Sequence, residues 1–203
     1  MARAEASTEE PIRPDLPDLS GLSLAEIARL AAERRLPPVD RWNPPHCGHS
    51  GMRIAADGTW FHEGAPIGRP AMVRLFASVL RREPDGRFVL VTPVEKLDID
   101  VEDAPFLAVE VTSEGSGRAR QLAFRLNTDD LVVAGPDHPI AFRPGPDGAH
   151  RPYLRVRGSA EAPLEARLVR PVFYQLAEWA LAETGGARAP GLWSGGQFLA
   201  FPH

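Results

Sequence analysis

The sequence lacks both a second cysteine and an excess of basic residues. Cys47 is the only cysteine among 203 residues, so no intramolecular disulfide can form. Lys and Arg number 23 against 27 Asp and Glu, which gives a formal net charge of −4 at pH 7. Because nucleic-acid backbones are bound by concentrated basic surfaces, this balance predicts no nucleic-acid partner.

Long apolar runs are missing as well. No segment approaches the roughly 18 continuous apolar residues that are typical of a membrane-spanning helix. The N-terminal stretch MARAEASTEEPIRPDLPDL has no apolar run of signal-peptide length. We therefore expect a soluble, cytoplasmic protein with no membrane partner.

Three common enzyme signatures are also absent. The sequence has no G-x-S-x-G nucleophile elbow, no phosphate-cradling G-x-x-x-x-G-K-[ST] and no G-x-G-x-x-G after a strand. These absences disfavour the common hydrolases and nucleotide-driven enzymes. They favour a protein without enzymatic activity, although they leave the question of catalysis open.

The start of the chain contains two different segments. Residues 1–20 are acidic, rich in proline and poor in aromatic residues, which predicts a disordered tail. Ser23 and Glu26 have the spacing of a capping box and predict a helix that runs to about Arg35. Pro37 and Pro38 then prevent the helix from continuing.

Two further amphipathic helices are expected, and each opens with Arg-Pro, where proline suits the first helical position. The apolar stripe after Arg69-Pro70 comprises Met72, Leu75, Phe76, Val79 and Leu80, and this helix is expected to continue until Pro84-Asp85-Gly86. The stripe after Arg170-Pro171 comprises Phe173, Leu176, Ala177, Ala180 and Leu181. The strand sequences that follow, GRFVLVTP and GQFLAFP, are also alike. We infer a repeated strand-helix-strand unit; chance is the alternative, because proline is common in the first turn of helices.

The remaining sequence predicts β-strands. Turn residues at Asp57-Gly58 and Gly64 divide the stretch 52–67 into short strands and predict a hairpin. The run TPVEKLDIDVED alternates apolar and acidic residues, as a strand with one solvated face does. Later alternating runs, with Leu122, Phe124 and Leu126 pointing inward, predict a β-rich C-terminal half.

Several short motifs occur in an order that resembles one known family. They are WNPP, CG, MRIAADGTWFHEGAPI, RPAMVRLFASVLRRE, DGRFVLVTPVEK, VEDAPF, LNTDD, DHPI and PYLRVRG. Over roughly residues 36–183 the chain closely resembles the bacterial domain-of-unknown-function family 1285. The resemblance implies two domains with repeated motifs and a C-terminal part similar to pleckstrin-homology barrels. It also implies a nucleotide-like ligand between the domains and a role in signalling, but no particular reaction.

We accordingly expect an α+β protein of two small domains with a repeated strand-helix-strand motif. A disordered tail (1–20) would precede an N-terminal α+β domain (21–103) and a β-rich C-terminal domain (104–203). The C-terminal domain would be a pleckstrin-homology-like antiparallel barrel closed by a helix. Its final strand (196–202) would pair either within this domain or with the other domain.

Aromatic, amide and basic side chains form the predicted ligand site. Aromatic rings offer stacking surfaces, and guanidinium or ammonium groups suit phosphate. Tyr153, Arg155 and Arg157 stand at alternate positions and should share one strand face, with Leu154 and Val156 toward the core. The alternative to a ligand site is that the tryptophans pack in the core and the arginines pair with acidic neighbours. The predicted ligand residues are Trp42, Asn43, Arg53, Trp60, Lys96, Tyr153, Arg155 and Arg157.

Metal sites and covalent catalysis are less favoured. His46, Cys47 and His49 lack the second, separate pair of ligands that zinc sites normally use, so we predict no metal site. An inert Cys47 thiol is favoured over a nucleophile, which would need a base and a lowered pKa. A carboxylate pair could still bind a divalent cation or act as acid and base, although a solvated face is the favoured interpretation. Its candidates are Glu95, Asp98, Asp100, Glu102 and Asp103.

Three functions are consistent with these features. We favour a non-enzymatic regulatory protein that binds a small phosphate-bearing or nucleotide-like ligand between its domains and so changes their orientation for a protein partner. The second hypothesis is a metal-assisted hydrolase that uses the acidic segment 95–103. The third is a protein-interaction scaffold or acidic-lipid binder. The sequence identifies no cofactor.

Overall fold

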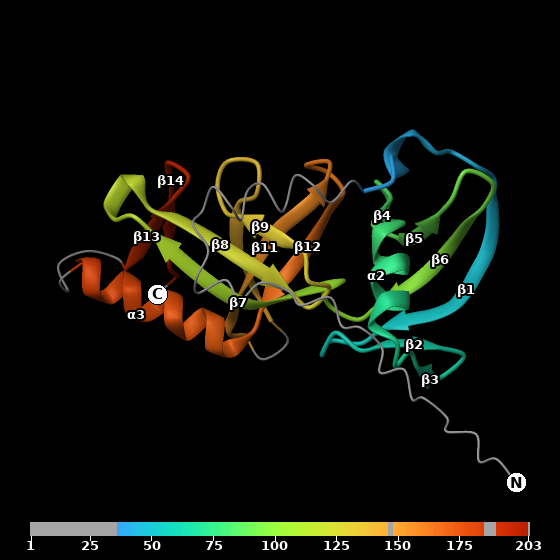
Figure 1. Cartoon of the computed structure of the whole chain (residues 1–203), viewed down its shortest axis with the longest axis horizontal. Helices are drawn as coiled ribbons and strands as arrows, with labels where there is room; N and C mark the ends of the chain where they lie inside the picture. The colour runs from blue at the N-terminus through green and yellow to red at the C-terminus, as the bar shows by residue number, and fades with distance from the viewer. Residues whose placement is uncertain (1–35, 146–147, 185–189, 203) are drawn as a thin grey trace, which may run out of the picture.

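Two six-stranded sheets lie side by side and form the two halves of the molecule (Figure 1). The computed structural model describes residues 36–145, 148–184 and 190–202. The tail expected at 1–20 and the helix expected at 23–35 lie outside these residues. Within the described part of the chain, none of the helices has the length and apolar character needed to span a bilayer.

The N-terminal sheet has the strand order β3-β2-β1-β6-β5-β4. Its strands β1 and β6 run parallel, whereas the other neighbours are antiparallel. A short 3-10 helix, η2, precedes the sheet, and helix α2 connects β3 to β4. The elements are η2 (Val39–Arg41), β1 (His46–Ile54), β2 (Trp60–His62), β3 (Ala65–Pro66), α2 (Pro70–Ser78), β4 (Leu80–Arg82), β5 (Phe88–Val91) and β6 (Lys96–Val101).

The C-terminal sheet has the order β10-β11-β12-β7-β8-β9, and helix α3 packs against it. A separate hairpin, β13-β14, follows α3. The elements are β7 (Phe106–Glu114), η3 (Gly117–Ala119), β8 (Gln121–Leu126), β9 (Leu131–Val133), β10 (Ile140–Pro144), β11 (His150–Gly158), β12 (Pro163–Leu168), α3 (Arg170–Thr184), β13 (Gly191–Ser194) and β14 (Gln197–Ala200).

The structure corrects the expected architecture of the C-terminal half. Strands β9 and β10 are the two unpaired edges of its sheet, so the sheet is open and the expected barrel is not confirmed. The final strand, β14, pairs antiparallel with β13 and not with the other domain. Alternating residues predict strands correctly, but closure depends on pairing between distant edge strands, which the pattern of one strand does not encode.

Helix α2 begins where an amphipathic helix was predicted, but it ends at Ser78, before the expected end, and its buried face differs in part. Pro70 occupies the first turn, as expected. Met72 and Leu75 of the predicted stripe are 40% and 62% exposed. Phe76, Val79 and Leu80 of the predicted stripe do pack inward, together with Val73 and Ala77, which the stripe did not include. Val73, Phe76, Ala77 and Leu80 have the i, i+3, i+4, i+7 spacing, shifted by one residue. Because both sets fit a helical period, only the surroundings decide which one is buried.

The second helix follows its predicted pattern more closely. Leu176 and Ala180 are fully buried, and Phe173 packs in an aromatic cluster with Phe142 and Phe201. Leu181, at the end of the predicted stripe, is exposed. Each Arg-Pro helix is preceded by a strand and followed by an antiparallel hairpin, β4-β5 or β13-β14. The local order of the two units is thus alike, while their common origin stays a prediction.

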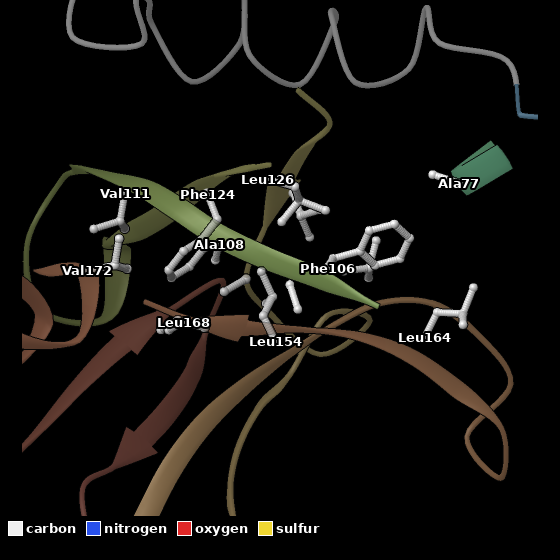
Figure 2. Packing of buried hydrophobic residues seen from close by; sticks show 14 of the residues in the cluster. Ala77, Phe106, Ala108, Val111, Phe124, Leu126, Leu154, Leu164, Leu168 and Val172 are labelled. Atoms are coloured by element: carbon white, nitrogen blue, oxygen red, sulfur yellow. The ribbon is translucent and has the colours of Figure 1, made fainter. Parts of the chain in front are cut away.

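One apolar core connects the two halves. Figure 2 shows Phe106, Phe124, Leu126 and Leu154 packed together in the C-terminal sheet, with Ala77 of α2 approaching from the other half. Leu122, Phe124 and Leu126 are completely buried, as their alternation predicted. Burying such side chains contributes about 1.5–3 kcal/mol each. The C-terminal sheet therefore provides most of the core against which the N-terminal half rests.

Specific polar contacts also join the halves. Arg74 Nη1 of α2 lies 2.9 Å from Asp129 Oδ2, which belongs to the LNTDD turn. Arg167 Nη2 donates a hydrogen bond of 2.7 Å to the carbonyl oxygen of Ala56. Gly58 has a φ of +84°, and a Cβ there would lie 2.9 Å from Leu107 of the C-terminal half. A side chain at position 58 would therefore force Leu107 to shift and would strain the backbone at a positive φ.

Candidate functional site at the seam between the sheets

A pocket of about 390 Å³ lies where the two halves meet, and we call it the seam pocket. Its N-terminal wall is formed by η2, the end of α2 and the edge strand β4. Its C-terminal wall is formed by the end of β11, the following turn and the start of β12. The residues on which the chemistry depends are Val39, Asp40, Ser78, Leu80, Arg81, Arg82, Glu83, Arg157, Ser159 and Leu164. A pocket between the domains was expected, and of the eight predicted ligand residues only Arg157 lines it.

Arg157 reaches the seam because β11 contains a β-bulge. Arg155 pairs with Glu165 on β12, but Arg157 pairs with Leu164, so Val156 has no partner in the register. The bulge places Arg157 on the face of the buried Leu164 and away from Arg155. The expectation that Tyr153, Arg155 and Arg157 share one face is therefore wrong for Arg157. Side chains alternate between the two faces of a strand, and the extra residue of a bulge reverses this order for the residues that follow. A simple alternating pattern in the sequence does not reveal a bulge.

The Arg157 guanidinium is held between the two halves. Its Nη2 donates hydrogen bonds to the carbonyl oxygens of Ala77 and Leu80, and the group lies 5.5 Å from the ring centroid of Phe106. Burial lowers the pKa of Arg157, and the charges of Asp130 and Asp40 partly oppose this shift. Among the described residues, no carboxylate lies within salt-bridge distance of the guanidinium.

Two more arginines line the pocket from β4. Arg81 is fully engaged: it pairs with Glu83 and donates hydrogen bonds to the carbonyl oxygens of Val39 and Trp42. Arg82 lies over the Phe88 ring at 5.3 Å and contacts the carbonyl of Gly86 at 3.4 Å. In the described part of the chain it has no ion-pair partner. Two arginines that line the seam pocket, Arg82 from the N-terminal half and Arg157 from the C-terminal half, thus have no carboxylate of the described residues within salt-bridge distance.

Arg82 is absent from the predicted ligand residues because the run Arg81-Arg82-Glu83 is expected to end a longer helix. In the structure the helix stops at Ser78, and β4 begins at Leu80. Two successive arginines after an amphipathic stripe were the only signal, and such residues are equally typical of a solvated helix end.

The predicted aromatic and amide ligands lie apart from the seam pocket. Trp60 is 1% exposed and belongs to the core of the N-terminal half. Trp42 is half-buried and Asn43 is exposed in the segment before β1. Trp60 therefore packs in the core, which was the alternative to its role in a ligand site.

The remaining predicted cations have partners of their own. Arg53 pairs with Glu102 and lies 4.3 Å from the centroid of the Phe61 ring. Lys96 Nζ lies 3.7 Å from Glu83 Oε2. Arg155 Nη2 donates a hydrogen bond of 2.7 Å to the carbonyl oxygen of Gly158. These groups are spread over both halves and do not form one site.

Several carboxylates of the acidic segment 95–103 contact arginine or imidazole side chains. Asp98 contacts His46 at 2.9 Å and Arg87 at 3.0 Å, and Asp100 lies 3.5 Å from His49. Glu102 pairs with Arg53, and Asp103 pairs with Arg167. In the described ranges, no three His, Cys, Asp or Glu residues gather in a way that could hold a metal ion. Cys47 is exposed, and its thiol contacts the carbonyl of Pro45 at 3.3 Å.

Tyr153 belongs to a polar network beside the domain junction. Its hydroxyl donates a hydrogen bond of 2.7 Å to Asp103 Oδ1, and Asp103 Oδ2 lies 2.6 Å from Arg167 Nε. Arg143 pairs with Glu165 and lies 4.8 Å from the Tyr153 ring centroid. Burial and the hydrogen bond to Asp103 raise the pKa of Tyr153 to about 12. The hydroxyl is thus committed to a structural contact with Asp103.

We expect the stability of the protein to fall at high pH through Tyr153. Because the folded pKa of about 12 exceeds the ordinary value of 10.0, the contribution is complete below pH 10 and is lost as the pH rises toward 12. In a Tyr174→Phe variant Tyr153 is the sole tyrosine, so phenolate absorbance should rise with a midpoint near 12. A midpoint near 10, in samples that circular dichroism shows to be folded, would contradict this expectation.

Comparisons with known proteins match both halves. The family model for the DUF1285 N-terminal domain, a domain of unknown function, matches residues 37–104, and the C-terminal model matches residues 105–201. The crystal structure of a DUF1285 family protein from Silicibacter pomeroyi DSS-3 is similar, with 45% identity and a TM-score of 0.75 over 86% of this chain and 93% of that one. For a DUF1285 family protein from Shewanella baltica OS155 the identity is 27% and the TM-score 0.49, over 64% and 92%. No curated protein matches the chain significantly.

Proposed function

We propose that this chain, which belongs to the DUF1285 family, is a non-enzymatic regulatory protein that binds a small phosphate-bearing or nucleotide-like ligand in the seam pocket. The observation that carries the proposal is the pair of guanidinium groups of Arg82 and Arg157, which border the pocket from opposite halves. Among the described residues, neither has a carboxylate within salt-bridge distance. Guanidinium groups bind phosphate with two parallel hydrogen bonds, so an anion would neutralise both.

The rest of the pocket suits the uncharged part of such a ligand. Val39, Leu80 and Leu164 give it an apolar wall, and Ser78 and Ser159 lie at its border. Its volume falls within the range of about 300–1,000 Å³ that is common for small-molecule sites. A sugar or base would lie against the apolar wall while the phosphate contacts the arginines.

A ligand between the halves can act as a regulator. Its affinity would depend on the distance between Arg82 on β4 and Arg157 on β11, because the two belong to different sheets. A ligand shifts a conformational equilibrium only by the difference in its affinity for the two states. Bound ligand would therefore favour one orientation of the halves, and a protein partner would recognise that orientation in signal transduction.

The finer architecture implied by the family resemblance is part of this proposal. The orders β3-α2-β4 and β12-α3-β13, each with an Arg-Pro start to the helix, support a duplicated strand-helix-strand unit. The similarity to pleckstrin-homology domains would then lie in the packing of α3 against an open sheet, and the C-terminal domain would not be a closed barrel. The hydrolase alternative gains no support from the geometry, because Asp98, Asp100, Glu102 and Asp103 all contact cationic or imidazole groups.

Ligand-dependent thermal stabilisation tests the proposal. Nucleotides, nucleoside phosphates and divalent cations would be added to the intact chain, and a ligand at about 100 times its Kd should add about 2.7 kcal/mol of stability. Arg82→Ala should weaken binding of the stabilising nucleotide about tenfold, as measured by calorimetry. Arg87→Ala is the matched control, because Arg87 lies in the same hairpin but pairs with Asp85 and Asp98 outside the pocket.

Two results would reject the seam pocket as a phosphate site. One is that no phosphate compound stabilises the wild-type chain. The other is that Arg82→Ala and Arg87→Ala bind the stabilising ligand equally well. Metal-dependent product formation would instead favour the hydrolase.

A further inference from the structure

A second cavity of about 510 Å³ lies in the C-terminal half, and we call it the end pocket. It forms where the start of β11, the end of β12 and the first turns of α3 meet. It shares no lining residue with the seam pocket. The side chains that matter for its chemistry are His150, Arg151, Arg167, Arg170, Phe173 and Tyr174.

The charged side chains among the described lining residues of the end pocket are all basic. Three arginines and a histidine line it, and the described lining residues include no aspartate or glutamate. Arg167 is neutralised by Asp103 at 2.6 Å, but Arg170 has no ion-pair partner in the described ranges. Since the whole chain has a formal charge of −4, this concentration of cations does not follow from composition. Such a surface favours an anionic ligand.

An aromatic surface adjoins these cations. Tyr174 is 53% exposed, although Val172 and Leu176 on the same helix are buried in the core. Its ring lies 6.0 Å from the Phe173 ring, and Phe173 is anchored against Phe142 and Phe201. The Arg170 guanidinium lies 6.0 Å from the Tyr174 ring centroid. An exposed ring with a fixed neighbour offers a planar ligand a stacking surface at small entropic cost.

We propose that the end pocket is a second binding site, for a soluble phosphate ester with a planar body such as a nucleoside diphosphate. The phosphate groups would contact Arg170 and Arg151, and the planar body would lie on Tyr174. The Arg170 guanidinium can donate two parallel hydrogen bonds to phosphate oxygens, and Arg151 adds a second positive charge beside it. This site shares no lining residue with the seam pocket, although its lining residue Arg167 also donates a hydrogen bond to the carbonyl oxygen of Ala56 in the N-terminal half.

Calorimetric titration with inorganic pyrophosphate and with ADP tests the end pocket. Arg170→Ala should weaken both probes at least about tenfold, the loss typical of one charge-assisted contact. Tyr174→Ala should weaken ADP about tenfold and leave pyrophosphate unchanged, since pyrophosphate has no planar body. Arg69→Ala is the matched control: Arg69 also precedes a helix-starting proline, is exposed and lines neither pocket.

Arg82→Ala separates the two sites. It should leave pyrophosphate binding unchanged at the end pocket, whereas loss of all binding in Arg82→Ala would assign the ligand to the seam pocket alone. If Arg69→Ala and Arg170→Ala weaken the binding of pyrophosphate and ADP equally, the effect comes from the total charge of the protein, and the proposed site is rejected. Binding only to vesicles that contain phosphatidylinositol phosphate, with none to pyrophosphate or ADP, would reject a soluble ligand.

Discussion

Replacing Arg157 by alanine is expected to lower the free energy of unfolding by about 2–4 kcal/mol. The substitution would leave the carbonyl oxygen of Leu80 without its guanidinium donor and that of Ala77 with only the backbone N–H of Val79, and both residues are buried. An unpaired buried acceptor costs about 1–3 kcal/mol, and the lost contact with the Phe106 ring adds about 0.5–2 kcal/mol. Release of the desolvated cation offsets part of this loss, because burial already disfavours the charged form.

Urea unfolding of the wild type and two variants measures this effect. Arg155→Ala is the control, because within the described ranges the side chain of this neighbouring arginine donates a hydrogen bond only to the nearby carbonyl of Gly158. It should cost about 1 kcal/mol. Equal losses in Arg155→Ala and Arg157→Ala would show that the contacts of Arg157 across the seam contribute nothing specific.

The same substitution should affect the proposed ligand. If a phosphate pairs directly with Arg157, Arg157→Ala should weaken its binding by about 1.5–3 kcal/mol, the loss typical of a charged hydrogen bond. Because the variant is also less stable, affinity must be measured by calorimetry at a temperature where circular dichroism shows it to be folded. Unchanged affinity in the folded variant would remove Arg157 from the ligand site.

Phe106→Ala should be the more destabilising substitution, with an expected loss of about 3–5 kcal/mol. Phe106 is completely buried at the start of β7 and packs in the C-terminal core (Figure 2). Its ring centroid lies 5.5 Å from the Arg157 guanidinium. Removing the ring leaves a cavity that the parallel pairing of β7 with β12 prevents from collapsing. Thermal and urea unfolding would both report the change.

A surface phenylalanine and a double substitution make the Phe106 test specific. Phe198→Ala, at a ring that is 45% exposed, should cost less than about 1.5 kcal/mol. Phe106→Ala combined with Arg157→Ala should cost less than the sum of the single losses, by about 0.5–2 kcal/mol, because each removes the same cation–ring contact. Strict additivity would show that this contact does not stabilise the seam.

The structure confirms predictions of where elements lie better than predictions of which residues on an element face the core. Leu122, Phe124 and Leu126 are buried as alternation predicted, and Pro70 opens α2. The stripe on α2 was wrong for Met72 and Leu75, because a second set of residues fits the same helical period. A periodic pattern identifies the type of element, but the residues that it buries depend on what packs against it.

The candidate site was harder to predict than the fold. Strict alternation placed Arg157 with Arg155, whereas the bulge at Val156 turns it toward the other half. Arg82 was missed because the sequence around it is typical of a helix end. Most of the other predicted cations meet carboxylates that are distant in sequence, as Arg53 does with Glu102.

By itself, the sequence of this protein determines the Arg-Pro starts of two helices, the strands on which Leu122 and Phe124 alternate, and the family to which the chain belongs. These properties depend on residues within a few positions of one another or on the order of motifs. Only the tertiary structure decides that both sheets stay open, which face of α2 is buried and that Arg157 joins Arg82 at one pocket. The physical reason is that strand-edge pairing, a single bulge and packing between the halves link residues far apart in the chain, and their energies do not appear in any local pattern.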